Sequence, residues 1–230
     1  MIVLDQVSKK YMTKYALRNV SLTLTKGKIV GLVGENGSGK STTLKLIAGL
    51  AQPTKGSVIV NGEFASRRIS EYVSYLSELD AYYSFFNVGQ TIDFYASQFR
   101  DFNKEKAEEI RTFMNLDRNV KVKHLSKGNR GRLKIVLTLA REAPVILLDE
   151  PLSGLDPIVR DSIVKSLISF IDIEKQLVLI TTHEINEIET LLDEIIVIKD
   201  GEIVGHRNVE ALRAEENISI VDWLKKVYKK

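Results

Sequence analysis

The sequence predicts an α/β fold with a parallel sheet at its centre, an antiparallel β part at the N-terminal end and a helical insertion. Three observations lead to this prediction. A glycine-rich loop at residues 34–41 follows an apolar strand and precedes a helical pattern. Residues 80–142 then change to helical periodicity. Two continuous apolar runs, at residues 144–150 and 176–183, flank a further helix, and such runs are typical of strands buried on both faces of a parallel sheet.

Composition favours one domain spanning residues 1–230. A chain of 230 residues with 44% hydrophobic residues can bury a large core. The net charge of +3 is too small to indicate a polyanionic partner, and the absence of cysteine excludes disulfides and thiolate metal sites. No apolar run reaches the roughly 18 residues of a membrane span. We therefore expect neither a signal peptide nor membrane insertion, and a membrane role would need another chain.

The N-terminal third alternates short strands and one helix. Residues 1–32 contain apolar clusters separated by turn signals, which favours strands. The segment "STTLKLIAGL" places Leu44, Ile47 and Leu50 at helical spacing, and Gly49 supplies a stop signal. The strand "GSVIVNG" closes on Asn61-Gly62, a tight-turn pair.

Two further helices follow from periodicity. The segment "KEKAEEIRTFMNL" places Ala107, Ile110, Phe113 and Met114 on one face, with Asn103 as the predicted N-cap. The segment "IVRDSIVKSLISFI" lies between the two apolar runs, so the order there is strand, helix, strand.

The loop "GENGSGKS" satisfies the pattern G-x-x-x-x-G-K-[ST] in its required context between strand and helix. Glycines let backbone amides turn toward phosphate oxygens, and the helix adds the positive end of its dipole. Lys40 is predicted to reach the β and γ phosphates and Ser41 to bind Mg²⁺. The predicted phosphate-binding residues are Gly34, Glu35, Asn36, Gly37, Ser38, Gly39, Lys40, Ser41 and Thr42.

Two acids end the first apolar run, in "VILLDEP". Their place at the carboxyl end of a buried strand is where α/β folds bind ligands. Asp149 is predicted to be a metal-side carboxylate, and Glu150 a general base that polarises the attacking water.

These motifs resemble those of the ATP-binding cassette (ABC) ATPases over essentially the whole chain. The segment "LSKGN", Leu125–Asn129, is similar to the family's signature and lies 24 residues before Glu150. The segment "SGLDP", Ser153–Pro157, is similar to its D-loop, and "TTH" ends at His183 where the family has its switch histidine. The resemblance implies a P-loop NTPase fold with a RecA-like core and a helical subdomain, near residues 80–142, that carries the signature.

The resemblance also implies site residues. Tyr11 falls where the family stacks an aromatic ring on adenine, although Tyr15 is a rival. His183 would hold the attacking water, and Ser126 and Gly128 would contact ATP held by a second subunit of a head-to-tail dimer. Glu78, which follows the strand "YVSYL", replaces the glutamine of the family's Q-loop. A carboxylate can still approach Mg²⁺, so Glu78 is a candidate metal-side residue.

The signature lies within the basic run "KHLSKGNRGRLK", and Lys127 replaces a glycine of the family pattern. Ser126 is the predicted N-cap of a helix over residues 127–142. We expect Arg130, Arg132 and Lys134 to form solvated and packing faces of this helix rather than a nucleic-acid surface. Lys127 either approaches the neighbour's γ-phosphate or faces solvent.

The resemblance implies an ATPase that powers transport, of the export type, through a separate membrane permease. Such a subunit would be a homodimer or heterodimer at the inner face of the cell membrane. The alternative is a soluble ABC ATPase acting on nucleic acid or ribosomes, which the absence of a long coiled-coil insertion and of a second cassette disfavours. Two segments have open roles. The aromatics of residues 79–88 either fill a core or dock a partner, and the basic C-terminal helix is expected to pack on its own domain rather than on a membrane.

Overall fold

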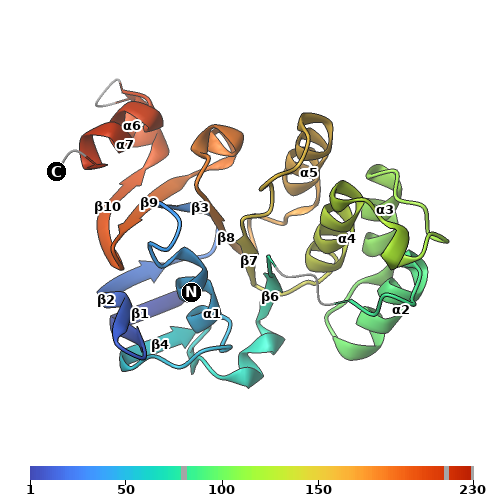
Figure 1. The fold of residues 1–230 in the computed structure, drawn as a ribbon, viewed down its shortest axis with the longest axis horizontal. Helices are drawn as coiled ribbons and strands as arrows, with labels where there is room; N and C mark the ends of the chain where they lie inside the picture. The colour runs from blue at the N-terminus through green and yellow to red at the C-terminus, as the bar shows by residue number, and fades with distance from the viewer. Residues whose placement is uncertain (79–81, 215–217, 229–230) are drawn as a thin grey trace.

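The N-terminal strands form an antiparallel sheet, as the turn signals predict. The computed structural model describes residues 1–78, 82–214 and 218–228. The sheet has the order β2-β1-β4-β5, and β2, β1 and β4 lie side by side in Figure 1. The Asn61-Gly62 turn joins the last two strands, with positive φ at both residues. Its strands are β1 (Ile2–Tyr11), β2 (Lys14–Leu24), β4 (Lys55–Val60) and β5 (Glu63–Phe64).

The central sheet has the order β10-β9-β3-β8-β7-β6 and is parallel except for its edge strand β10. The carboxyl ends of β3, β7 and β8 therefore meet at one edge, where the glycine-rich loop and the acids lie. Its strands are β3 (Lys28–Val33), β6 (Val73–Leu76), β7 (Val145–Asp149), β8 (Leu177–Thr182), β9 (Glu194–Lys199) and β10 (Glu202–Asn208).

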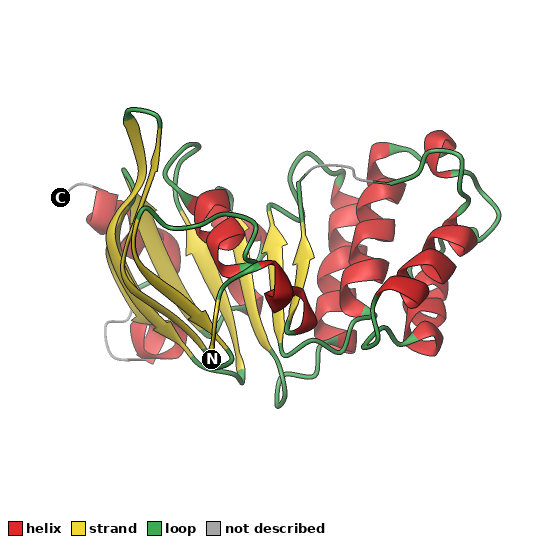
Figure 2. Ribbon diagram, turned by 90° about the horizontal axis from the view of Figure 1, so that it is seen from below, coloured by secondary structure: helices red, strands yellow, loops and turns green. Residues whose placement is uncertain are grey.

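Both faces of the parallel sheet are buried, which explains its continuous apolar runs. In β7, Val145 and Leu147 pack into the core shared with α1 (Lys40–Ile47) and the antiparallel sheet. The alternate residues Ile146 and Leu148 pack into the second core, which the other helices cover. Helix α1 thus belongs to the core between the two sheets, and the strands and the helical region lie toward opposite ends of the molecule (Figure 2).

The short helix η1 (Arg67–Glu71) precedes β6 and packs Ile69 into the core of the antiparallel sheet, and the helical region follows β6. Asn87 caps α2 (Val88–Gln98) in a capping box with Gln90, and Asn103 caps α3 as predicted. Asp156 caps α5. The other helices between β6 and β9 are α3 (Lys104–Phe113), η2 (Val122–His124), α4 (Lys127–Leu139), α5 (Pro157–Phe170), η3 (Ile185–Glu187) and η4 (Glu189–Leu191).

The C-terminal helix packs on its own chain, which confirms the expectation for residues 218–228. Trp223 and Leu224 of α7 (Ile220–Tyr228) are buried in the larger core, beside α6 (Val209–Ala214). Gly205 of β10 leaves room for the Trp223 ring, since a Cβ there would lie 2.9 Å from two of its atoms. Lys229 and Lys230 lie outside the described residues.

Three details of the predicted helices are wrong. Leu50 is 63% exposed, because α1 ends at Ile47 and Gly49 leaves helical geometry with φ +68°. Phe113 is 43% exposed, although its ring packs on Phe170 with centroids 5.4 Å apart. Helix α4 ends at Leu139, not at residue 142.

None of the helices in the described ranges is long and apolar enough to cross a membrane. The first part of the aromatic segment, residues 79–81, lies outside the described residues.

Candidate nucleotide-binding site

The glycine-rich loop connects β3 to α1 and needs glycine at particular positions. Gly39, the residue before α1, has φ +117°, a conformation that side chains rarely adopt. Gly34 touches the loop and β9 so closely that a Cβ would collide with the Ile198 carbonyl. The loop therefore folds back on itself with its amides at the N-terminal end of α1.

Lys40 is the first residue of α1 and is only 5% exposed. Its ammonium donates to the Gly34 carbonyl at 2.7 Å and to the Glu35 carbonyl at 3.2 Å. It also lies 3.2 Å from Oε1 of Glu150. A buried cation is thus held by its own loop and points toward the acids of β7.

Asp149, 2% exposed, ends β7 and accepts three hydroxyl hydrogen bonds. Ser41 and Thr181 donate to its Oδ1 at 3.0 and 2.9 Å, and Tyr75 donates to its Oδ2 at 3.1 Å. Burial, with the Asp149 charge as a second cause, raises the pKa of Tyr75, so its phenol stays protonated and can keep donating. The aspartate is fixed in place next to the loop hydroxyl of Ser41.

Glu150 follows Asp149 in a left-handed backbone conformation with φ +48°. Its amide donates to Oγ1 of Thr181 at 3.0 Å, which holds this turn. Its Oε2 lies 2.8 Å from Nδ1 of His183, at the end of β8. Strained backbone at a non-glycine residue recurs at active sites, where the surrounding contacts hold it in place.

These groups surround one cavity of about 480 Å³. It brings together nine of the predicted residues, and Ala16 and Ser153 complete the wall. The nine are Asn36, Gly37, Gly39, Lys40, Ser41, Thr42, Glu78, Glu150 and His183. Residues from the loop, from β7, from β8 and from the segment after β6 therefore converge as the motif spacing predicts.

Three residues that the family resemblance implies, Tyr11, Ser126 and Gly128, do not line this cavity, and neither does the rival Tyr15. Tyr11 is 48% exposed and carries the Lys9 ammonium 4.9 Å above its ring, while Tyr15 packs against Lys10 and Arg18. Ala16, rather than either tyrosine, lines the cavity, so adenine stacking stays a prediction. Ser126 caps α4 as predicted, with its Oγ accepting from the Asn129 amide at 3.2 Å. Gly128 packs on Val159 of α5 and does not line the cavity.

Thr181 and Tyr75 are site residues that the sequence motifs did not reveal. Thr181 bonds both acids of β7, and Tyr75 holds Asp149. Their only sequence signal is a polar residue inside an otherwise apolar strand, which by itself is common.

The loop suits a phosphate ligand. The Ser38 hydroxyl is buried, and no hydrogen-bond partner is found for it among the described residues. Gly37, with φ +81°, has open space where a Cβ would stand. A buried hydroxyl, a buried ammonium and a helix N-terminus are all donors that fit phosphate oxygens.

Comparison with known proteins is consistent with this geometry. Residues 17–153 match the family model described as ABC transporter. The chain belongs to this family. It is therefore an ABC transporter ATP-binding protein and an ATPase.

Individual ABC relatives match over nearly the full chain. The ABC transporter ATP-binding protein NatA of Bacillus subtilis is 30% identical over 237 residues, which cover 97% of this chain and 96% of NatA. The ABC transporter ATP-binding protein YtrB of the same organism is 29% identical over 217 residues, covering 94% and 74%.

Solved ABC structures share the fold. The structure described as a dimeric post-hydrolysis state of the ATP-binding cassette MJ0796 bound to ADP and Pi has a TM-score of 0.81 at 26% identity, with 90% of this chain and 98% of that chain covered. An ATP-binding subunit of an ABC transporter has a TM-score of 0.86 at 22% identity, with 99% of each chain covered. The P-loop NTPase fold with a parallel sheet, an antiparallel sheet and a helical region is thus confirmed.

Proposed function

We propose that this chain is the ATP-hydrolysing subunit of an ABC transporter whose membrane-spanning part is a separate chain. The observation that carries the proposal is the placement of Glu150, whose carboxylate lies between the Lys40 ammonium and the His183 imidazole at the wall of the phosphate cavity. This is the arrangement expected of a base that activates water beside a phosphate site.

Each group has a distinct role in the proposed reaction. The loop amides and Lys40 bind and neutralise the phosphates of ATP. Glu150 accepts the proton of the attacking water, and His183, held by Glu150, orients that water. Lys40 stabilises negative charge on the leaving phosphates as the bond breaks.

The acceptor oxygens fit a magnesium ion. The Ser41 hydroxyl lies 3.0 Å from a buried Asp149 oxygen, and Glu78 lines the same cavity. Serine and carboxylate oxygens are the ligands that Mg²⁺ takes in such sites. We propose that Ser41, Asp149 and Glu78 would hold this ion. When bound, Mg²⁺ would supply positive charge that neutralises the phosphates of ATP.

In this proposal, the signature residues act across the interface between two subunits. Ser126 and Gly128 do not line the cavity of their own chain, as expected if they close over ATP held by a second subunit. The MJ0796 cassette, which shares the fold, was solved as a dimer bound to ADP and Pi. ATP would thus join two subunits, and hydrolysis would let them separate.

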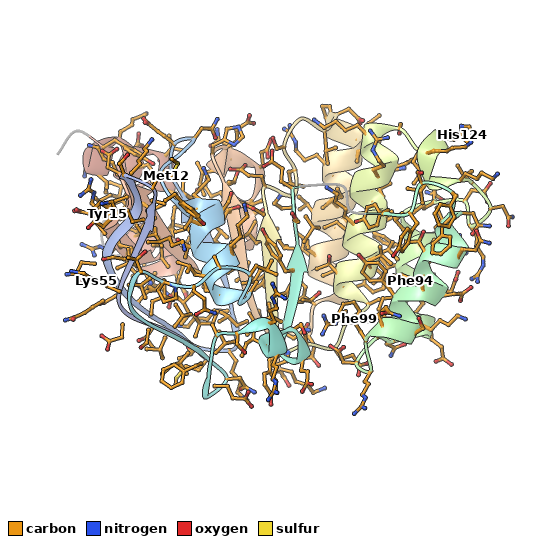
Figure 3. All side chains as sticks on the ribbon, turned by 60° about the horizontal axis from the view of Figure 1, so that its bottom comes forward. Met12, Tyr15, Lys55, Phe94, Phe99 and His124 are labelled. Carbon is orange, nitrogen blue, oxygen red and sulfur yellow. The ribbon has the colours of Figure 1, made fainter. Side chains whose placement is uncertain are left out.

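The helical region offers a surface for the membrane partner. We name as the aromatic surface Tyr82, Tyr83, Phe85, Phe86 and Phe94. Tyr83 and Phe85 are 52% and 66% exposed, whereas Tyr82 packs partly on the core. A hollow of about 490 Å³ is lined by Tyr82, Tyr83, Phe86, Phe94 and Phe99. Phe85 does not line it but contacts the rings of Tyr83 and Phe86. Figure 3 places Phe94 and Phe99 on the helical side, away from Tyr15 on the antiparallel sheet.

Exposed aromatic rings around a hollow are typical of protein contacts. The proposed occupant is a cytoplasmic helix of the permease, which would place this chain at the inner face of the cell membrane. Export is the proposed direction, from the resemblance of the motifs to bacterial export cassettes.

Capture from detergent-solubilised native membranes tests the proposal. The immobilised protein should retain a polytopic membrane protein identified by mass spectrometry. The double variant Tyr83→Ala/Phe85→Ala should lose it, while Phe64→Ala, which removes a ring 71% exposed on β5, should not. Association with ribosomes instead, with RNA-stimulated ATPase activity, would contradict the proposal and favour the soluble alternative.

A further inference from the structure

Helix α4 contacts two loops that border the nucleotide cavity, through lysines on one face. Lys127 and Lys134 are seven residues apart, close to two helical turns, so their side chains leave the same side of the helix. Both line a second cavity of about 280 Å³ that also includes Glu78, Glu150 and Ser153. Because these last three residues also line the nucleotide cavity, the two cavities are neighbours.

Lys134 binds the segment that carries Glu78. Its ammonium donates to the Glu78 carbonyl at 2.6 Å and to the Ser77 carbonyl at 3.2 Å. Lys134 thus lies on a packing face of α4, as expected, and its contact there is with the segment of Glu78. Hydrogen bonds from a charged donor are stronger than neutral ones, and two to adjacent carbonyls fix the local backbone.

The other end of the same face meets the D-loop. The Lys127 ammonium lies against Gly154, where an added Cβ would collide with it, and Gly154 has φ +64°. Gly128 and Gly131 bring the helix close to Val159 and Leu155. The D-loop and the first turns of α4 thus form one packed unit, to which Lys134 adds the segment of Glu78.

We infer that Lys134 is a positioning residue, which fixes Glu78 at the nucleotide cavity by holding its backbone to the signature helix. Through Lys134 and Lys127, α4 joins the segment of Glu78 to the D-loop, so a movement of the helical region changes both walls of the cavity. The inference rests on the proposed function of this cavity as the ATP site.

The test compares Lys134→Met, which keeps the length of the side chain and removes its charge, with Lys134→Arg. In Lys134→Met, kcat should fall about tenfold, the scale of one lost charge-assisted hydrogen bond, while the Kd for ATP stays within about twofold. Amide hydrogen exchange at residues 75–78 should become faster. Lys134→Arg should retain part of the parental kcat and part of the protection from exchange. Lys165→Met is the control, since Lys165 pairs only with exposed Asp161 in the described structure and should change neither.

A double-mutant cycle separates positioning from general damage. If Lys134 acts through Glu78, then Lys134→Met should lower kcat much less in a Glu78→Gln background than in the parent. Equal effects in both backgrounds, or parental exchange at residues 75–78 in Lys134→Met, would overturn the inference. The proposed function of the cavity is tested separately by Lys40→Ala. If this variant still binds ATP as the parent does, the cavity is not the ATP site, whatever the Lys134 variants show.

Discussion

Nδ1 of His183 lies 2.8 Å from Oε2 of Glu150, across the gap between the ends of the neighbouring strands β8 and β7. The other carboxylate oxygen of Glu150 lies 3.2 Å from the Lys40 ammonium. One carboxylate is thus positioned by an imidazole on one side and by the phosphate-loop cation on the other. In the proposed reaction, this carboxylate is the group that accepts the proton of the attacking water.

The first prediction concerns Glu150→Gln. The amide keeps the size of the side chain but cannot accept the proton, so turnover should fall by about 100-fold or more, whereas ATP binding is retained. Gel filtration with ATP should show a dimer that the parent forms only transiently. Glu109→Gln, at an exposed position of α3, should hydrolyse ATP at the parental rate. Normal steady-state hydrolysis by Glu150→Gln would show that another group is the base.

The second prediction uses the backbone strain at Glu150. At most positions alanine is more stable than glycine by about 0.5–1 kcal/mol. At φ +48° the order should invert, so that Glu150→Gly has a free energy of unfolding about 1 kcal/mol above Glu150→Ala. Both variants lack the carboxylate, so the difference between their free energies of unfolding reports the backbone conformation alone. Urea unfolding measures it, and a more stable alanine variant would contradict the strain.

The residues of the phosphate loop and the acids after the buried strand could be predicted from the sequence, because each motif is contiguous along the chain and its position between strand and helix follows from the local pattern. The loop, its helix α1 and the acids after β7 lie where the pattern of strand, loop and helix puts them. That His183 and Glu150 belong to one site was implied by the family resemblance, and the structure shows that they end neighbouring parallel strands. The 2.8 Å distance between the two side chains could not be predicted from the sequence.

Contacts between distant segments were not predictable. The two carbonyls bound by Lys134 lie 56 and 57 residues away along the chain, and nothing near Lys134 in the sequence indicates them. The exposure of Leu50 has a different cause. Its spacing matched the apolar face of α1, but the helix ended one turn earlier than the periodicity implied.

The third prediction is a pH dependence of stability from Glu187, four residues after the switch histidine. Burial is the main cause that raises the pKa of Glu187 to about 7, and a hydrogen bond with Glu184 is the second. The guanidinium of Arg160, whose Nη2 lies 2.8 Å from Oε1 of Glu187, opposes the shift. Since the folded protein binds this proton more tightly than the unfolded chain, stability falls as pH rises from about 4.5 to 7. The loss should be on the order of 1–3 kcal/mol.

Thermal unfolding of the parent and of Glu187→Gln between pH 4.5 and 8 measures this contribution. The parent should lose more stability over that range than the variant, because glutamine cannot ionise. His183 and Glu184 also face this site and are present in both proteins, so the difference between the two slopes reports Glu187. Parallel curves would contradict the raised pKa.

The last prediction concerns the packing of α7 on β10. A Cβ at Gly205 would stand 2.9 Å from two atoms of the buried Trp223 ring, so Gly205→Ala must push the ring or the helix outward. We expect a loss of about 1–3 kcal/mol in the free energy of unfolding. In Gly205→Ala/Trp223→Ala the clash is absent, so adding Gly205→Ala to Trp223→Ala should cost much less than adding it to the parent. Equal costs in the two backgrounds would mean that the ring does not set the packing distance, whereas a large coupling would identify Trp223 as the residue that fixes α7 to the sheet edge.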